Sequence, residues 1–192
     1  MIMPAQVKTN TIYQIKVTLK GSKPPIWRRI QVDSGTTLFK LHQVLQDAMD
    51  WSGGHLHQFE IHGRHYSHPD YELDKHGDDI LDERKFKLSQ VSLEEKMKFS
   101  YEYDFGDGWE HELLIEKIIQ NQEKLSHPVC LAGKRACPPE DCGGPWGYAE
   151  LLEILSDPKH PEYEERKEWV GSYFNPEEFD IEETNRELKQ VN

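Results

Sequence analysis

The segment Lys98–Ile118 constrains the fold of this chain more than any other part, because its two faces are strongly marked. Apolar and polar residues alternate on both sides of a central Gly-Asp-Gly turn, and an alternation of this kind is the period of a half-buried strand. The positions that share the apolar face are Phe99, Tyr101, Tyr103, Phe105, Trp109, His111, Leu113 and Ile115. The segment therefore predicts a β-hairpin that lays an aromatic face on the core.

The pattern also predicts the register of this hairpin. A three-residue loop, Gly106–Gly108, keeps apolar residues opposite apolar residues, whereas a two-residue loop would place glutamates opposite aromatic rings. Gly108 supplies the left-handed residue that a three-residue loop needs. The expected pairs are Phe105 with Trp109, Tyr103 with His111 and Tyr101 with Leu113. The opposite face then collects Glu102, Asp104, Glu110 and Glu112, which either solvent screens or a cation relieves.

The N-terminal part of the chain predicts strand, strand, helix and strand in that order. Residues 12–20 and Ile26–Val32 alternate as strands, and Arg28 falls among the inward positions, where it needs a partner. An apolar stripe at helical spacing covers about 37–50, and His55–Ile61 reads as a third strand. This order is typical of an α+β fold with a β-grasp-like mixed sheet and a packed helix.

The remainder of the chain is less regular. Residues 62–90 read as a long polar excursion, and residues 120–146 read as a loop that holds all three cysteines. Helical patterns return at Tyr148–Leu155, Glu162–Val170 and Ile181–Leu188. We expect these helices to pack on the sheet within one domain, since 192 residues fit a single domain.

Charge narrows the range of partners and compartments. The chain carries 35 acidic and 23 basic residues, a net charge of −12, and no stripe of Lys and Arg stands out. Direct binding to nucleic acid is therefore disfavoured, because it normally requires a basic face.

Three unevenly spaced cysteines make no disulfide framework, and residues 1–10 lack an apolar run of signal length. We expect a cytoplasmic protein with no membrane span.

Two groups of residues are candidate metal ligands. In the first, the rings of His55 and His57 share one side of a strand, and Asp107 and His111 of the hairpin are candidates to join them around zinc or another divalent ion. The alternative for His57 is a core histidine with a hydrogen-bond partner. The second group is His127, Cys130, Cys137 and Cys142, whose spacing is loose for structural zinc, so the alternative is that the cysteines only fill the core.

Several strings in the sequence resemble the plasmid pRiA4b ORF-3-like family. They are Ile26-Trp-Arg-Arg-Ile30, Thr37-Leu-x2-Leu-His42, Trp51-x3-His-Leu-His-x-Phe59, Tyr103-Asp-Phe-Gly-Asp-Gly-Trp-x-His111 and Cys137-Pro-Pro-Glu-Asp-Cys-Gly-Gly144 with Gly147-Tyr148. The resemblance covers about residues 12–188 and implies one domain over residues 1–192. It implies a domain of unknown activity with a link to mobile genetic elements, and it transfers no catalytic residue.

These observations leave two classes of function open. The first is a non-catalytic binding or adaptor domain for a protein partner, with Trp27, Arg29, Tyr101, Tyr103 and Trp109 as its contact residues. Its basis is that these aromatic residues look exposed in the sequence pattern and that no nucleophile motif or cofactor motif is present. The second is a metal-dependent hydrolase or a nuclease-like enzyme that uses a His/Asp site. In the expected register His111 and Asp104 face opposite sides, so they cannot belong to one site.

Overall fold

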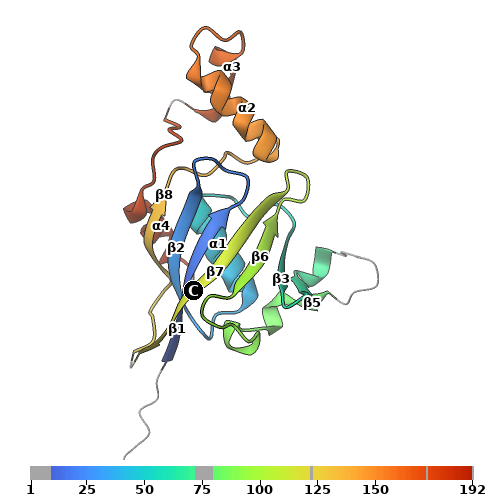
Figure 1. Cartoon of the computed structure of the whole chain (residues 1–192), viewed down its shortest axis with the longest axis vertical. Coiled ribbons are helices and arrows are strands. Elements are labelled where there is room, and N and C mark those ends of the chain that lie inside the picture. The colour runs from blue at the N-terminus through green and yellow to red at the C-terminus, as the bar shows by residue number, and fades with distance from the viewer. Residues whose placement is uncertain (1–9, 72–79, 122, 172, 192) are drawn as a thin grey trace, which may run out of the picture.

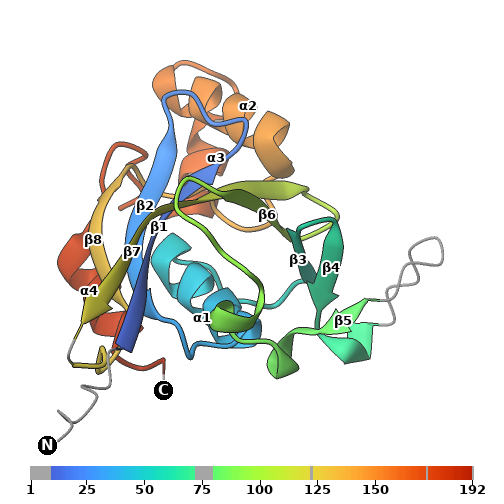
Figure 2. The same cartoon turned by 60° about the horizontal axis from the view of Figure 1, so that its bottom comes forward.

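The computed structural model describes residues 10–71, 80–121, 123–171 and 173–191. Its centre is one open sheet of eight strands in the order β5-β4-β3-β6-β7-β1-β2-β8. The sheet curves around helix α1 (Leu38–Met49), which fills its concave side (Figures 1 and 2). The strands are β1 Asn10–Leu19, β2 Ile26–Asp33, β3 His57–Ile61, β4 Arg64–Ser67, β5 Leu81–Asp82, β6 Lys98–Tyr103, β7 Trp109–Asn121 and β8 Val129–Lys134.

The first two strands and the helix confirm the sequence prediction. Alternate residues of β1 and β2 are buried against α1, while Trp27, Arg29 and Gln31 face the other way. The Thr37 hydroxyl accepts from the backbone N–H of Lys40 and so begins α1, as an N-cap residue should. Asp50 ends the helix in the left-handed conformation. The apolar stripe of α1 therefore meets the inner face of the sheet.

Arg28 has the partners that its inward position requires. Its guanidinium donates to the carbonyl oxygens of Ala48 and Lys134 at 2.8 and 3.1 Å, and its carbon lies 4.0 Å from the ring centre of Phe179. Gly133 makes room for this stack, because a Cβ there would lie 2.4 Å from the Phe179 ring. A buried arginine with these contacts ties β2, β8 and the end of α1 together.

The α+β class is confirmed, but the β-grasp-like part of the prediction is not. Within the described residues, the only parallel pair is the short β4–β5 pair at one edge, and the central strands β6, β7, β1 and β2 are all antiparallel. Residues 62–90 are also more regular than expected, since they contain β4, β5 and three 3₁₀ turns at Pro69–Tyr71, Glu83–Lys85 and Leu88–Gln90. Within that range, residues 72–79 lie outside the described part of the chain.

The C-terminal half adds one strand and three helices. The expected loop at 120–146 contains β8, which pairs with β2 at the sheet edge. Helix α4 (Ile181–Leu188) packs on β8, where the Asn185 side chain hydrogen-bonds both the N–H and the carbonyl of Cys130 at 2.8 and 2.9 Å. Helices α2 (Gly144–Ser156) and α3 (Tyr163–Val170) stand beyond the end of the sheet (Figure 1). Over the described residues, no helix has the length and apolar character that crossing a membrane requires.

Candidate functional site

The register of the hairpin differs from the expected one by two residues. Tyr103 lies opposite Trp109, and Tyr101 lies opposite His111, so the predicted pairs of Phe105 with Trp109, Tyr103 with His111 and Tyr101 with Leu113 are wrong. The cause is Asp104, which turns into the left-handed conformation and accepts from the N–H groups of Gly106 and Asp107 at 3.0 and 3.3 Å. The strand therefore ends at Tyr103. Because the shift is two residues, every strand side chain keeps the predicted face.

The aromatic residues of the hairpin are core residues. Tyr101, Tyr103 and Trp109 are at most 1% exposed, so none of them can serve as the contact surface that the sequence suggested. Trp27 and Arg29 do reach the outer face of the sheet. There the Arg29 guanidinium binds Glu116 at 2.5 Å and lies 5.3 Å from the Trp27 ring. Both residues are thus partnered within the sheet.

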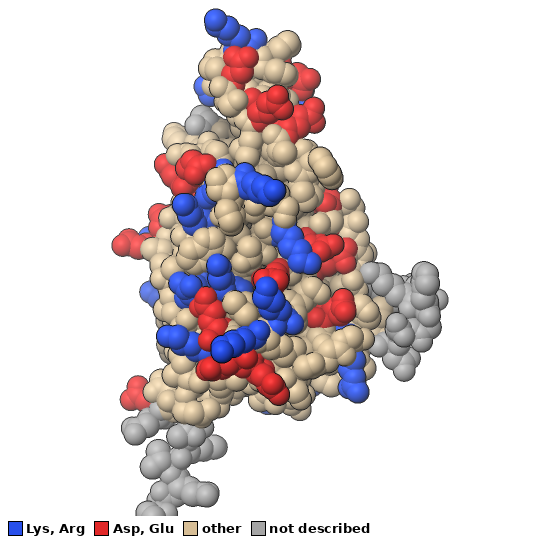
Figure 3. Space-filling model, in the orientation of Figure 1, with Lys and Arg blue, Asp and Glu red and all other residues tan. Residues whose placement is uncertain are grey.

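The outer face of the sheet carries charges of both signs. The glutamates that the sequence placed there are relieved by neighbours: Lys20 binds Glu110 at 2.9 Å, and Lys98 binds Glu112 at 3.0 Å. In the view of Figure 3, Lys and Arg are interspersed with Asp and Glu over this face. An interspersed pattern gives no basic track for a nucleic-acid backbone.

The hairpin turn meets the cysteine-containing loop that precedes α2. The Tyr103 hydroxyl donates to Glu140 at 2.5 Å, and the Asp107 carboxylate accepts from the N–H of Gly143 at 3.3 Å. A Cβ on Gly144 would lie 2.2 Å from the Asp107 carbonyl oxygen, so only glycine allows this approach. Two motifs that are far apart in the sequence therefore form one junction.

Three possible metal ligands converge at this junction. His55 lies between two carboxylates, with Nδ1 3.6 Å from Asp104 Oδ2 and Nε2 3.6 Å from Asp141 Oδ1. One ligand atom from each residue can be chosen so that all three atoms lie within 4.8 Å of one another. Among the described residues this is the single group of three or more His, Cys, Asp or Glu side chains that meets this test. The group can hold a metal ion.

The two ligand sets expected from sequence are not brought together. His55 precedes β3 and reaches the junction, whereas His57 and His111 point into the core and are at most 1% exposed. Asp107 lies at the junction, where it binds Gly143, and it is not one of the three converging residues. The four residues of the first set therefore do not form one site, because His57 and His111 lie in the core while His55 lies at the junction.

The cysteine set fails because its members lie on different elements. Cys130 is in β8 opposite Ile30, Cys137 packs against Met49 of α1, and Cys142 comes just before α2. His127 hydrogen-bonds the neighbouring Pro128 carbonyl at 2.9 Å. Burial raises the pKa of Cys137 to about 11 and that of Cys142 to about 12. Both thiols of the metal-free protein therefore stay protonated at neutral pH, which does not suit nucleophilic catalysis.

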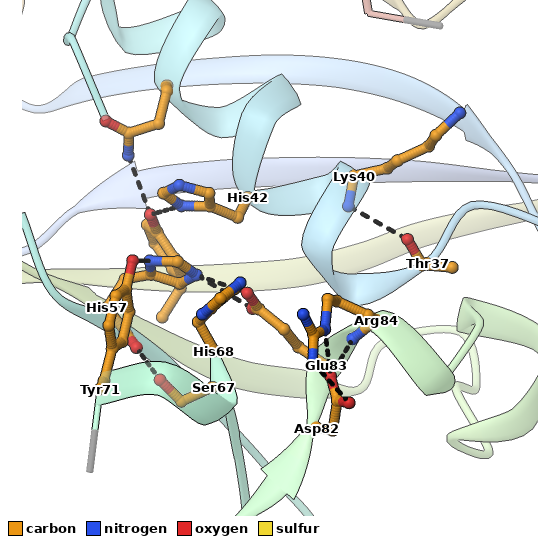
Figure 4. Close-up of polar contacts among 12 residues, drawn as sticks. Thr37, Lys40, His42, His57, Ser67, His68, Tyr71, Asp82, Glu83 and Arg84 are labelled. Atoms are coloured by element: carbon orange, nitrogen blue, oxygen red, sulfur yellow. Dashed lines mark hydrogen bonds and ion pairs between the residues drawn. The ribbon is translucent and has the colours of Figure 1, made fainter. Parts of the chain in front are cut away.

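A second polar assembly lies beneath α1 (Figure 4). The His57 ring binds the Glu83 carboxylate at 2.9 Å through Nε2 and lies 3.3 Å from the Tyr71 hydroxyl through Nδ1. The ring of His42 stacks flat on it, with the ring centres 3.5 Å apart and the planes 2° from parallel. The alternative given for His57, a core histidine with a partner, matches this arrangement.

Burial sets the charge of this assembly. It raises the pKa of Glu83 to about 7 and lowers the pKa of His57 to about 3 and that of His42 to about 2. Desolvation is the main cause in each case, because all three side chains lie away from water. The assembly therefore avoids isolated buried charge near neutral pH.

Comparison with known proteins places the chain in a family. The model of the plasmid pRiA4b ORF-3-like protein family matches residues 11–183. The chain belongs to this family. It is 41% identical over 163 residues to the uncharacterized protein y4hQ of Sinorhizobium fredii, a match that covers 84% of this chain and 82% of that protein. The crystal structure of a protein of unknown function from Methanosarcina mazei, MM3350, is similar with a TM-score of 0.80 and 41% identity over 91% of this chain and 98% of that one.

Sequence reasoning missed several residues of both assemblies in this family member. Glu83 lies in residues 62–90, which the sequence predicts to be a polar excursion. His42 lies on α1, whose buried stripe is predicted from its aliphatic residues. Asp141 lies between Cys137 and Cys142, and in this segment the sequence pattern indicates the cysteines as the metal ligands. A signal was present for His42 and Asp141, since both fall within the strings that carry the family resemblance. No sequence signal singled out Glu83, because its burial depends on where β5 pairs.

Proposed function

We propose that this chain is a metal-dependent hydrolase centred on His55, Asp104 and Asp141. The observation that carries the proposal is an imidazole flanked by two carboxylates at a place that solvent reaches. The exposed fraction of the side chain rises from 12% for Asp104 to 32% for His55 and 75% for Asp141. Such a gradient gives an ion one anchored ligand and one open side.

The donor set suits a divalent transition metal. One imidazole nitrogen and two carboxylate oxygens are ligands for Zn²⁺, Mn²⁺ or Fe²⁺. Three protein ligands leave coordination positions free for water and substrate, as in catalytic sites, whereas structural sites are closed by four. A divalent ion at such a site acidifies water and polarises a carbonyl group.

Neighbouring groups hold the ligands in place. Oδ1 of Asp104 accepts from two backbone N–H groups, which leaves Oδ2 directed at His55. Glu140, next to Asp141, accepts from the Tyr103 hydroxyl and from the N–H of Ser52 at 3.0 Å. These contacts fix both loops before any ion binds, as hydrogen bonds to metal ligands do in known metal sites.

A cavity beside Asp141 supports a small substrate. It has a volume of about 200 Å³ and lies between the junction and helices α2 and α3. Its lining includes Asp141, Cys142, Glu150, Arg166 and Trp169. Because Asp107 and Glu140 add negative charge nearby and the chain carries −12 overall, we infer a neutral or cationic substrate, not a nucleic acid.

The binding-domain alternative has lost most of its basis. Three of its five contact residues are buried, and the other two are partnered within the sheet. Other aromatic residues are exposed, among them Trp146 of α2 at 88% and Tyr173 at 95%. A protein partner stays a prediction, and these two residues are where we would first look for its contact.

Hydrolysis assays test the proposal. The untagged protein is stripped with a chelator, reloaded with Zn²⁺ or Mn²⁺, and assayed on the neutral ester p-nitrophenyl acetate and on a cationic aminoacyl p-nitroanilide. We expect metal-dependent turnover of at least one of these, lost in Asp104→Asn and His55→Gln but kept in the matched surface variants Asp70→Asn and His62→Gln. Turnover that the chelator leaves unchanged, or no turnover of any probe by the metal-loaded protein, would contradict it.

A further inference from the structure

We propose that a second site, the cleft between α1, Trp51–Gly53 and His68–Tyr71, binds a planar heterocycle with an amide-like edge, such as a nucleobase or a nicotinamide ring. The cleft is separate from the His55 junction, and its ligand needs no metal. Two buried polar atoms and one glycine carry the inference.

The first polar atom is Oε1 of Gln46. This side chain is only 4% exposed, and its amide nitrogen donates to the Tyr101 hydroxyl at 2.8 Å. Among the described residues, Oε1 has no hydrogen-bond partner, although Gln46 lines the cleft. A buried acceptor without a partner is costly, and native proteins rarely leave one unpaired. Gln46 therefore holds an unsatisfied acceptor at the wall of the cleft, and a ligand N–H that reached Oε1 would satisfy it.

The second polar atom is Nε2 of His42. The Tyr101 hydroxyl has one proton and already accepts from Gln46, so it donates that proton to His42 Nδ1 at 2.7 Å. The ring must then carry its own proton on Nε2, which makes Nε2–H a donor. Burial lowers the pKa of His42 to about 2, so the ring stays neutral. Stacking on His57 fixes its plane (Figure 4).

Gly53 shows that the donor and the acceptor face the same space. A Cβ built on Gly53 would lie 3.8 Å from His42 Nε2 and 4.0 Å from Gln46 Oε1. The two atoms come from successive turns of α1, as residues four apart do. A donor beside an acceptor is the complement of a carboxamide or of the hydrogen-bonding edge of a nucleobase.

The cleft has the size and lining for such a ring. Its volume is about 670 Å³, within the range of small-molecule sites. Aromatic side chains line it: Phe39 and His68 have ring centres 6.0 Å apart, and His68 and Tyr71 have theirs 5.3 Å apart. Asp47 also lines the cleft, which disfavours an anionic ligand. The geometry thus combines flat apolar walls with one oriented polar pair.

Titration with defined probes tests the inference. Adenine and nicotinamide are added at millimolar concentration to the chelated protein, with ¹H–¹⁵N spectra to locate the binding and calorimetry to measure it. We expect at least one probe to shift amides of α1 and Trp51–Gly53. We expect N6,N6-dimethyladenine, or N,N-dimethylnicotinamide for the second probe, to bind at least about tenfold more weakly, since the methyl groups replace the exocyclic N–H groups that would donate to Gln46.

The matched variants are Gly53→Ala and Gly63→Ala. Both glycines have a positive φ, of 73° and 71°, so both substitutions strain the backbone alike. Only the methyl at Gly53 enters the cleft, because nothing lies within 4 Å of a Cβ at Gly63. We expect binding to fall at least about tenfold in Gly53→Ala and to persist in Gly63→Ala. No cleft shift with either probe, or equal binding by both variants, would overturn the inference.

Discussion

The two assemblies of histidine and carboxylate lie on either side of Tyr103 and differ in burial. The ring of Tyr103 lies 5.7 Å from that of His55 and 6.4 Å from that of His42. Beneath α1, His57 and Glu83 are at most 1% exposed and touch at 2.9 Å. At the junction, the contacts of His55 are 3.6 Å long and its partners reach solvent. Histidine and carboxylate side chains thus form a buried, hydrogen-bonded pair beneath α1 and a solvent-accessible, more widely spaced group at the junction.

The difference separates two kinds of chemistry. Burial without solvent discourages charge, so Glu83 and His57 have shifted pKa values and share a direct hydrogen bond. No space is left between them for an ion. At the junction the ligand atoms lie apart and face water, which is what an incoming cation needs. Because it is buried, the assembly beneath α1 supports the fold and the cleft. The solvent-exposed group at the junction is the candidate metal centre.

The largest effect we expect is from Glu83→Ala. It leaves the neutral His57 ring without its hydrogen-bond partner and removes buried side-chain volume, and the two losses together should lower the free energy of unfolding by about 3–4 kcal/mol. Urea unfolding measures the change. Glu162→Ala, which breaks an exposed ion pair with Arg166 within α3, is the control and should cost under about 0.5 kcal/mol. An equal loss of unfolding free energy in the two variants would contradict the claim that the buried carboxylate stabilises the fold more than an exposed one does.

Acidification should destabilise the fold through the buried histidines. Burial holds the pKa values of His42, His57 and His111 at about 2, 3 and 4, below their ordinary value of 6.5. Below pH 6.5 the unfolded chain therefore binds more protons at these three sites, and the stability they contribute at neutral pH is lost. Glu83 opposes this, because its raised pKa favours the fold at low pH and that contribution is lost as the pH rises through about 7.

With three sites against one, the net change is a loss. We expect the free energy of unfolding to fall by about 2–3 kcal/mol between pH 7 and pH 5. Glu83→Gln should make the fall steeper, since it removes the opposing group and keeps a hydrogen bond to His57. Urea unfolding at a series of pH values checks both slopes. A flat profile would mean that the histidines are not held neutral by burial.

A smaller effect should come from Gly144→Ala at the junction. Its methyl group would meet the Asp107 carbonyl oxygen, so the hairpin turn and the loop before α2 must move apart. We expect a loss of about 2 kcal/mol together with weaker metal binding. Gly108→Ala has a similar positive φ but nothing within 4 Å of the new Cβ, and it should cost about 1 kcal/mol with metal binding unchanged. Thermal unfolding with and without added Zn²⁺ compares the two.

Local patterns predicted β1, β2, β3, β6, β7 and the four helices but not β4, β5 or β8, because the alternation in β1 and β2 and the stripe of α1 follow directly from one buried face. The hairpin faces were predictable for the same reason. Its register was not, since Asp104 ends the strand through side-chain hydrogen bonds that compete with pairing. The site was only partly predictable: His55 was found by its spacing. Asp141 joins it through a tertiary junction that Gly144 permits.

The number of metal ions bound per chain tests the central claim most directly. Untagged protein, stripped and then dialysed against Zn²⁺ or Mn²⁺, is analysed by mass spectrometry for metal content beside Asp104→Asn, Asp141→Asn and the core variant His57→Gln. We predict one ion per chain in the wild type and in folded His57→Gln, and none in the two junction variants. Wild-type protein without bound metal, or metal kept by both junction variants, would contradict the assignment of His55, Asp104 and Asp141 as the metal centre.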